Sequence, residues 1–156
     1  MNESMIQFSY DGFCLQFDKE NLRYSILAGK TAWETEENFS PFFRVKACEK
    51  PIYFKEAKEQ KHELVKSGVG EGIRSSYSGF SLPDFYNENR HGHTLSSDKD
   101  KTVSGEEKKN EFSFETFVWV EYSTKQVYFE WIPLIEAPLN CVEQVLFPGP
   151  FSFKKE

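Results

Sequence analysis

Three glutamates are the first candidates for chemistry, because hydrolysis by general acid–base catalysis uses a pair of carboxyl groups. Glu115, Glu121 and Glu130 fall in strand-like stretches, and more glutamates crowd a turn at residues 34–37. Carboxylates on the outer face of a sheet are normally solvated and need no further role. We therefore assign no catalytic residue to this chain.

Other reactive groups are equally weak candidates. No serine stands in a Gly-x-Ser-x-Gly elbow, and no Ser/His/Asp set can be assembled from the sequence. His91 and His93 share a polar stretch but lack a third ligand, so we expect no metal site there. Gly68–Gly72 lacks the Lys-Ser/Thr pair and the helix of a phosphate-binding loop, which favours a tight turn or bulge. No cofactor is expected.

Aromatic side chains offer a different chemistry, since sugar rings stack on them while polar groups bond the hydroxyls. Residues of suitable type stand at two places in the chain. The candidate substrate-binding residues are Trp33, Arg74, Tyr77, Asp84, Phe85 and Tyr86. The competing interpretation, that most of these rings simply fill a core, is favoured about two to one.

Composition narrows the class of protein. The 156 residues suit one domain, and aromatic residues make up 17 % of them, which favours a layered β core. A formal net charge of -6 gives no attraction to nucleic acid or to anionic membranes. The chain has no long apolar run and no signal peptide. Its three cysteines are scattered, so we expect buried free thiols and a cytoplasmic protein.

Short alternating stretches predict a β-meander in the first part of the chain. Residues 5–10, 13–17 and 22–27 alternate between apolar and polar side chains, and Asp11-Gly12 is a hairpin turn signal. Residues 55–61 are the one stretch with a helical composition. A surface turn is the most that they predict, because they carry too little apolar surface to bury a face.

The strongest pattern lies at residues 111–122 and 126–132, which predict a hairpin. Phe112, Phe114, Thr116, Val118 and Val120 would face one way, and Ser113, Glu115, Phe117, Trp119 and Glu121 the other. Another strand is expected at residues 140–147. Together these elements predict an all-β fold, an antiparallel β-sandwich with at most one short helix.

The domain organisation follows from two further stretches. Residues 81–110 are rich in charged and small polar residues, and the part at about 87–110 is expected to be a mobile loop. Residues 1–156 form one predicted sandwich domain. Phe151–Phe153 looks like the start of a further strand, which suggests that the sequence is a fragment of a longer chain.

Several stretches together resemble the early part of bacterial glycoside hydrolase family 31 proteins. They are residues 43–46, 51–55, 70–80, 114–121, 127–134 and 147–151, of which 127–134 is the most similar. The resemblance spans roughly residues 40–153. It implies a galactose-mutarotase-like β-sandwich placed before a (β/α) barrel that carries both catalytic aspartates of a retaining α-glycosidase.

The sequence after Pro150 is too short to hold such a barrel. The resemblance therefore implies a non-catalytic N-terminal domain whose partners are the catalytic barrel of the same polypeptide and a carbohydrate. It also implies that residues 74–86 lend a loop to the substrate pocket. The alternatives are a stand-alone carbohydrate-binding module and a protein-interaction β domain.

Overall fold

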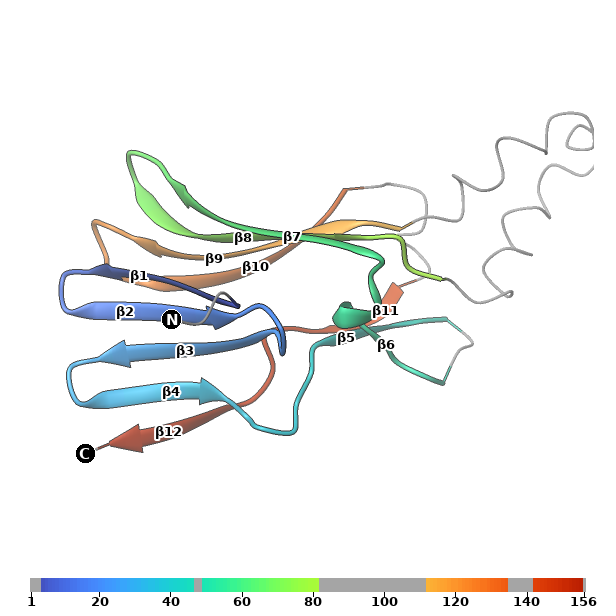
Figure 1. The fold of residues 1–156 in the computed structure, drawn as a ribbon, viewed down its shortest axis with the longest axis horizontal. Coiled ribbons are helices and arrows are strands. Elements are labelled where there is room, and N and C mark those ends of the chain that lie inside the picture. The colour runs from blue at the N-terminus through green and yellow to red at the C-terminus, as the bar shows by residue number, and fades with distance from the viewer. Residues whose placement is uncertain (1–3, 47–48, 82–111, 135–141, 156) are drawn as a thin grey trace, which may run out of the picture.

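The computed structural model describes residues 4–46, 49–81, 112–134 and 142–155, and nearly all of its regular structure is β (Figure 1). The strands are β1 Met5–Tyr10, β2 Phe13–Asp18, β3 Arg23–Ala28, β4 Thr31–Thr35, β5 Phe42–Val45, β6 Ile52–Tyr53, β7 Glu59–Lys66, β8 Gly70–Ser78, β9 Phe114–Glu121, β10 Val127–Pro133, β11 Val142–Leu146 and β12 Phe151–Lys155. Every recorded strand pair is antiparallel. This confirms the predicted antiparallel sandwich.

The first sheet has five strands in the order β1-β2-β3-β4-β12. Asp11 and Gly12 have φ angles of 52° and 80°, the left-handed conformation that a tight hairpin turn between β1 and β2 requires. The predicted meander is therefore present, and the third strand is shifted by one residue. The alternation did not predict β4, which the last strand joins by pairing Phe153 with Trp33.

The second sheet has four strands in the order β10-β9-β8-β7. Alternate residues of β9 are buried, from Phe114 to Val120, while those between them are half-buried. Val127, Phe129 and Trp131 of β10 pack against the same core. The predicted hairpin and its two faces are thus confirmed. The turn predicted at Gly68–Gly72 is present only in its first part, because residues 67–69 join β7 to β8 and Gly70 and Gly72 already belong to β8.

A third, smaller sheet of order β11-β5-β6 lies at the end of the sandwich away from the marked termini (Figure 1). A 3-10 turn at Phe54–Glu56 follows β6 and buries Phe54 completely. The helical turn predicted at residues 55–61 is wrong for its second half, because β7 begins at Glu59 and pairs along its length with β8. Within the described ranges no helix is long and apolar enough to cross a membrane.

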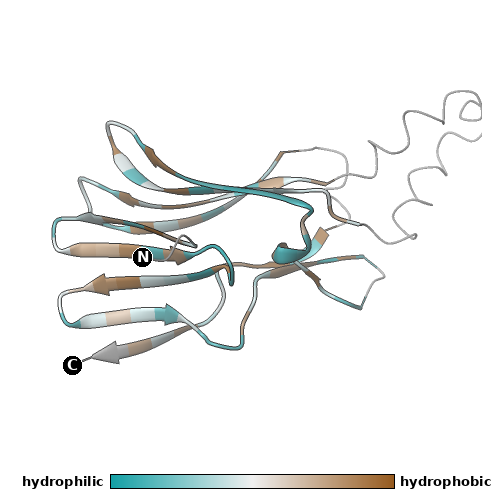
Figure 2. Cartoon of the chain, viewed as in Figure 1, coloured by the Kyte–Doolittle hydropathy of each residue, from teal (hydrophilic) through white to brown (hydrophobic). Residues whose placement is uncertain are grey.

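Apolar residues recur along the strands of both large sheets (Figure 2), and their aromatic rings pack together in one core. Phe17 stacks on Tyr24 within the first sheet, with ring centroids 4.6 Å apart. Tyr24 meets Phe129 of the second sheet edge-on at 5.8 Å. The core therefore joins the two large sheets through ring contacts. Cys14 is a half-buried free thiol, and Cys48 and Cys141 lie outside the described residues.

Candidate functional site

Of the predicted sugar-binding residues, the structure describes Trp33, Arg74 and Tyr77, and it places these three apart. Asp84, Phe85 and Tyr86 lie outside the described residues, as do the loop at about 87–110 and its two histidines. Tyr77 is a core residue, 1 % exposed, whose ring centroid lies 5.3 Å from that of Phe114. Its side chain thus has a packing role.

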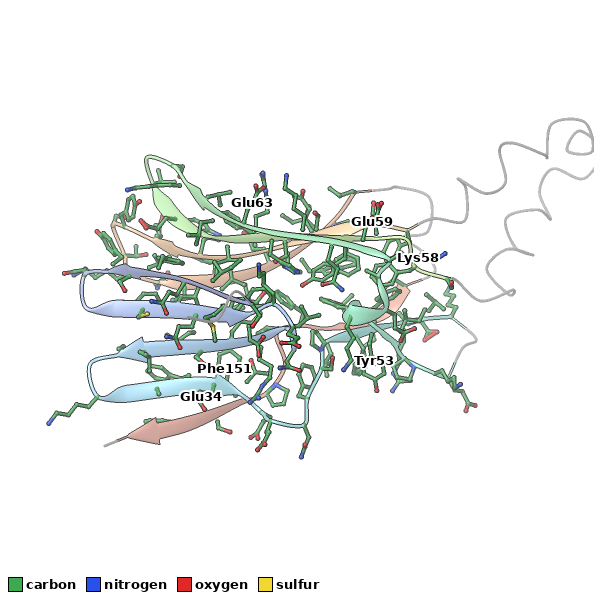
Figure 3. All side chains as sticks on the ribbon, in the orientation of Figure 1. Glu34, Tyr53, Lys58, Glu59, Glu63 and Phe151 are labelled. Carbon is green, nitrogen blue, oxygen red and sulfur yellow. The ribbon has the colours of Figure 1, made fainter. Side chains whose placement is uncertain are left out.

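Trp33 and Arg74 belong to different sheets. Trp33 of β4 stacks on Phe153 with centroids 5.5 Å apart and planes 19° apart. Arg74 of β8 projects from the four-stranded sheet, and its guanidinium donates to Oε2 of Glu63 from Nη2 at 2.8 Å and from Nε at 3.3 Å. Glu63 lies on the side of this sheet that faces away from the five-stranded sheet (Figure 3).

The outer side of the four-stranded sheet also carries an aromatic surface that the sequence-based site prediction missed. Trp119 stacks on Phe117 at 5.7 Å with planes 15° apart, and on Tyr128 at 5.0 Å with planes 25° apart. All three side chains are half-buried. We call Phe117, Trp119 and Tyr128 the aromatic face. The alternation of β9 could have revealed it, because that pattern places Phe117 and Trp119 opposite the core side.

Two glycines of β8 make room for the indole of Trp119. A Cβ at Gly70 would lie 2.7 Å from Cε3 of Trp119, and one at Gly72 would lie 2.5 Å from its Cβ. Gly72 and Trp119 are direct cross-strand partners. Because the glycines have no side chains, the indole packs on the backbone of β8. Gly70 and Gly72, which lie next to the turn between β7 and β8, therefore make room for the aromatic face.

Polar groups hold the rings from the side of β10. The Nε1–H of Trp119 donates to Oε1 of Glu130 at 3.2 Å. The hydroxyl of Tyr128 donates to Oε1 of Gln126 at 2.9 Å. Indole and phenol groups are thereby fixed by hydrogen bonds at their polar ends, while the rings, stacked on one another, stay half-buried.

The carboxylate of Glu63 does not have the electrostatic surroundings of a glycosidase general acid. The hydrogen bond from Arg74, with the charge of Lys61, lowers the pKa of Glu63. A general acid needs a raised pKa instead. No cluster of three or more potential metal ligands occurs among the residues that the structure describes.

A polar hollow of about 190 Å³ is a weaker candidate, lined by Gln16, Asp18, Arg23 and Glu34 among others. Its polar groups already serve the fold. Oδ1 of Asp18 accepts from the backbone of Glu20 at 2.9 Å, and Nη2 of Arg23 donates to the carbonyl of Thr35 at 2.9 Å. We therefore place the candidate site on the aromatic face.

Known structures share this fold over almost the whole chain. An α-N-acetylgalactosaminidase from Bifidobacterium bifidum in complex with GalNAc is 26 % identical, with a TM-score of 0.69, over 94 % of this chain and 18 % of that chain. The chain is similar to one part of a glycoside hydrolase. The same enzyme bound to Gal-NHAc-DNJ gives a TM-score of 0.70 at 26 % identity, over 94 % of this chain and 19 % of that one. Its ligand-free form gives 0.66 at 26 % identity, over 94 % and 18 %.

This chain therefore spans less than a fifth of the length of the bifidobacterial enzyme that it matches. No protein-family model matches the sequence, and no curated protein matches it either. The sandwich thus corresponds to a domain-sized part of a much larger glycosidase.

Proposed function

We propose that this chain is a non-catalytic domain of a glycoside hydrolase, packed against a catalytic domain of the same polypeptide. The observation that carries the proposal is the match of 94 % of the chain to only 18 % of a glycosidase at 26 % identity.

A contact surface for the neighbouring domain is suggested by one row of the five-stranded sheet. Leu15, Ile26, Trp33 and Phe153 are successive cross-strand partners on the same face. The exposed fraction of the side chains rises along the row, from 0 % at Leu15 and 8 % at Ile26 to 54 % at Phe153. The row ends at β12, the strand at the outer edge of its sheet (Figure 1). An apolar row whose side chains become more exposed towards the edge of the sheet is typical of a surface that contacts another domain.

The finer assignment, to a galactose-mutarotase-like domain of family 31 preceding a (β/α) barrel, is supported by the sequence resemblance alone. The resembling stretches correspond to β5, β8, β9 and β10, together with the segments around β6 and the start of β12. A retaining α-glycosidase is the activity proposed for the whole protein.

Two measurements test the proposal. The purified 156-residue chain should release no nitrophenol from 4-nitrophenyl α-N-acetylgalactosaminide or α-glucoside. The coding sequence should continue in frame beyond Glu156 into a barrel-sized region. Turnover that disappears in a single carboxylate variant such as Glu115→Gln would overturn the proposal, and so would a stop codon directly after Glu156.

A further inference from the structure

We propose that the aromatic face formed by Phe117, Trp119 and Tyr128 binds a neutral carbohydrate. This surface lies on the four-stranded sheet, whereas the Trp33–Phe153 pair of the proposed domain contact lies on the five-stranded sheet. A sugar site here is therefore independent of whether a catalytic domain follows. It also differs from the sugar-binding residues that the sequence predicted: of the three that the structure describes, only Arg74 belongs to the outer side of this sheet.

Ring geometry is the first argument. The planes of Phe117 and Tyr128 lie within 15° and 25° of the plane of Trp119. The three rings stack on one another across β9 and β10 into one apolar cluster, and because each side chain is only half-buried, the part of the cluster left exposed offers apolar surface to the C–H face of a pyranose. Several rings within 6 Å of each other would contact more than one edge of a sugar, or two successive units of a chain.

Preorganisation is the second argument. Trp119 is held below by Gly70 and Gly72, and its Nε1–H is held by Glu130 at 3.2 Å. A ring that is fixed before binding loses little side-chain entropy when a ligand arrives. The hydroxyl of Tyr128 is likewise fixed by Gln126 at 2.9 Å. The surface thus resembles a rigid platform more than an adaptable patch.

Charge selects the class of ligand. Along the four described strands, the same outer side carries the carboxylates of Glu59, Glu63, Glu115, Glu121 and Glu130 and the cations of Lys61 and Arg74. Carboxylates accept hydrogen bonds from sugar hydroxyls, but they repel phosphate, sulfate and uronate groups. A docked protein domain would have to desolvate these charges, which is unfavourable unless each is paired. A small neutral sugar leaves most of them hydrated.

The test uses the three tryptophans of the chain as separate reporters. The full chain is labelled with ¹⁵N-tryptophan, and the indole N–H signals of Trp33, Trp119 and Trp131 are followed during titration to 100 mM. The probes are N-acetylgalactosamine, methyl α-glucoside and maltotriose, with sodium glucuronate as the anionic control. We expect a saturating shift of the Trp119 signal with a neutral probe, a dissociation constant in the millimolar range, and no response to glucuronate.

Variants separate binding from folding. Tyr128→Ala should weaken binding at least tenfold while the signals of Trp33 and Trp131 keep their positions. Trp33→Phe, on the other sheet, should leave the titration unchanged. An unmoved Trp119 signal with all three neutral probes would overturn the inference, and so would a sugar response confined to Trp33. Either result would leave the hydrolysis and reading-frame tests of the proposed function unaffected.

Discussion

Nδ1 of His62 lies 2.7 Å from Oγ of Ser75, its direct partner across β7 and β8. Nε2 of the same ring lies 3.1 Å from Oε1 of Gln60. An amide oxygen only accepts, so Nε2 carries the proton and Nδ1 accepts from the serine hydroxyl. The neutral ring is therefore satisfied on both sides, and burial, with the charge of Lys19, lowers the pKa of His62 from 6.5 to about 4.

This His62 geometry predicts a loss of stability in acid. In the unfolded chain His62 titrates near 6.5, so between pH 6.5 and 4 the unfolded state binds more protons than the folded state. Above this pH window His62 does not lower the free energy of unfolding, and as the pH falls through the window it lowers that free energy increasingly. Because the ring is only partly buried, we expect the effect to be on the order of 1 kcal/mol.

Urea unfolding at pH 7.5, 6, 5 and 4.5 measures the effect. Carboxylates also titrate in this range, so the informative quantity is the difference between the wild type and His62→Gln. Glutamine keeps a group that can bond Ser75 but does not titrate. The variant should lose less stability on acidification, and parallel pH profiles would contradict the prediction.

Because Trp119 lies close to β8, we expect glycine-to-alanine substitutions near it to destabilise the fold more than the same substitution in the adjoining turn. A Cβ at Gly72 would lie 2.2 Å from the carbonyl oxygen of Val118, whereas one at Gly68 meets nothing within 4 Å. Gly72→Ala should destabilise the fold by about 2 kcal/mol or more, because backbone atoms must move. Gly68→Ala should change the unfolding free energy by less than about 1 kcal/mol. Equal urea midpoints for the two variants would rule out this packing.

Phe114 is expected to be among the most sensitive core positions. Its side chain is 0 % exposed, and its ring centroid lies 4.7 Å from that of Phe54 and 5.5 Å from that of Trp131. Phe114→Ala should cost about 3–5 kcal/mol, since it removes buried contacts and leaves a cavity. Leu64→Ala, at a side chain that is 51 % exposed, is the matched control and should cost under about 1 kcal/mol. Thermal and urea unfolding followed by circular dichroism would reveal a contrary ranking.

The side chain of Thr35 bonds the backbone of β3 just beyond Ser25 and Glu34, the last recorded partners of β3 and β4. Its buried Oγ1 accepts from the backbone N–H of Tyr24 at 3.0 Å and donates to the Tyr24 carbonyl at 3.3 Å. Thr35→Val keeps the shape but leaves both buried backbone groups unpaired, so we expect a loss of about 1–3 kcal/mol. Thr31→Val at the other end of β4 should be close to neutral. Faster amide exchange at Tyr24 in Thr35→Val, but not in Thr31→Val, would identify the lost bonds, and unchanged exchange would contradict the prediction.

Local alternation was sufficient to predict much of this fold. Strands with a clear period of two, such as β9, were placed correctly because their side chains alternate between a buried and a half-buried face. β4 was missed since all but one of its side chains are half-buried and its sequence alternates weakly. The start of β7 was read as helical because Lys, Glu and Gln at 58–61 favour helices, while pairing with β8 decides the conformation.

The candidate site was harder to predict because it depends on which strands are neighbours. Trp119 and Tyr128 are cross-strand partners, so their contact follows once the hairpin register is known. The role of Gly70 and Gly72 requires the additional pairing of β8 with β9. By contrast Trp33 and Arg74, chosen from the sequence for their chemistry, are separated because the chain assigns them to different sheets.

The pairing of β4 with β12 also sets an order of events during synthesis. Residues 31–35 leave the ribosome early, yet their partner at residues 151–155 is made only after β5 to β11. Throughout that interval β4 is an open edge whose backbone groups could pair with another nascent chain. Of the three described sheets, the five-stranded sheet therefore receives its final strand last, and β4 can be covered only once β12 has emerged.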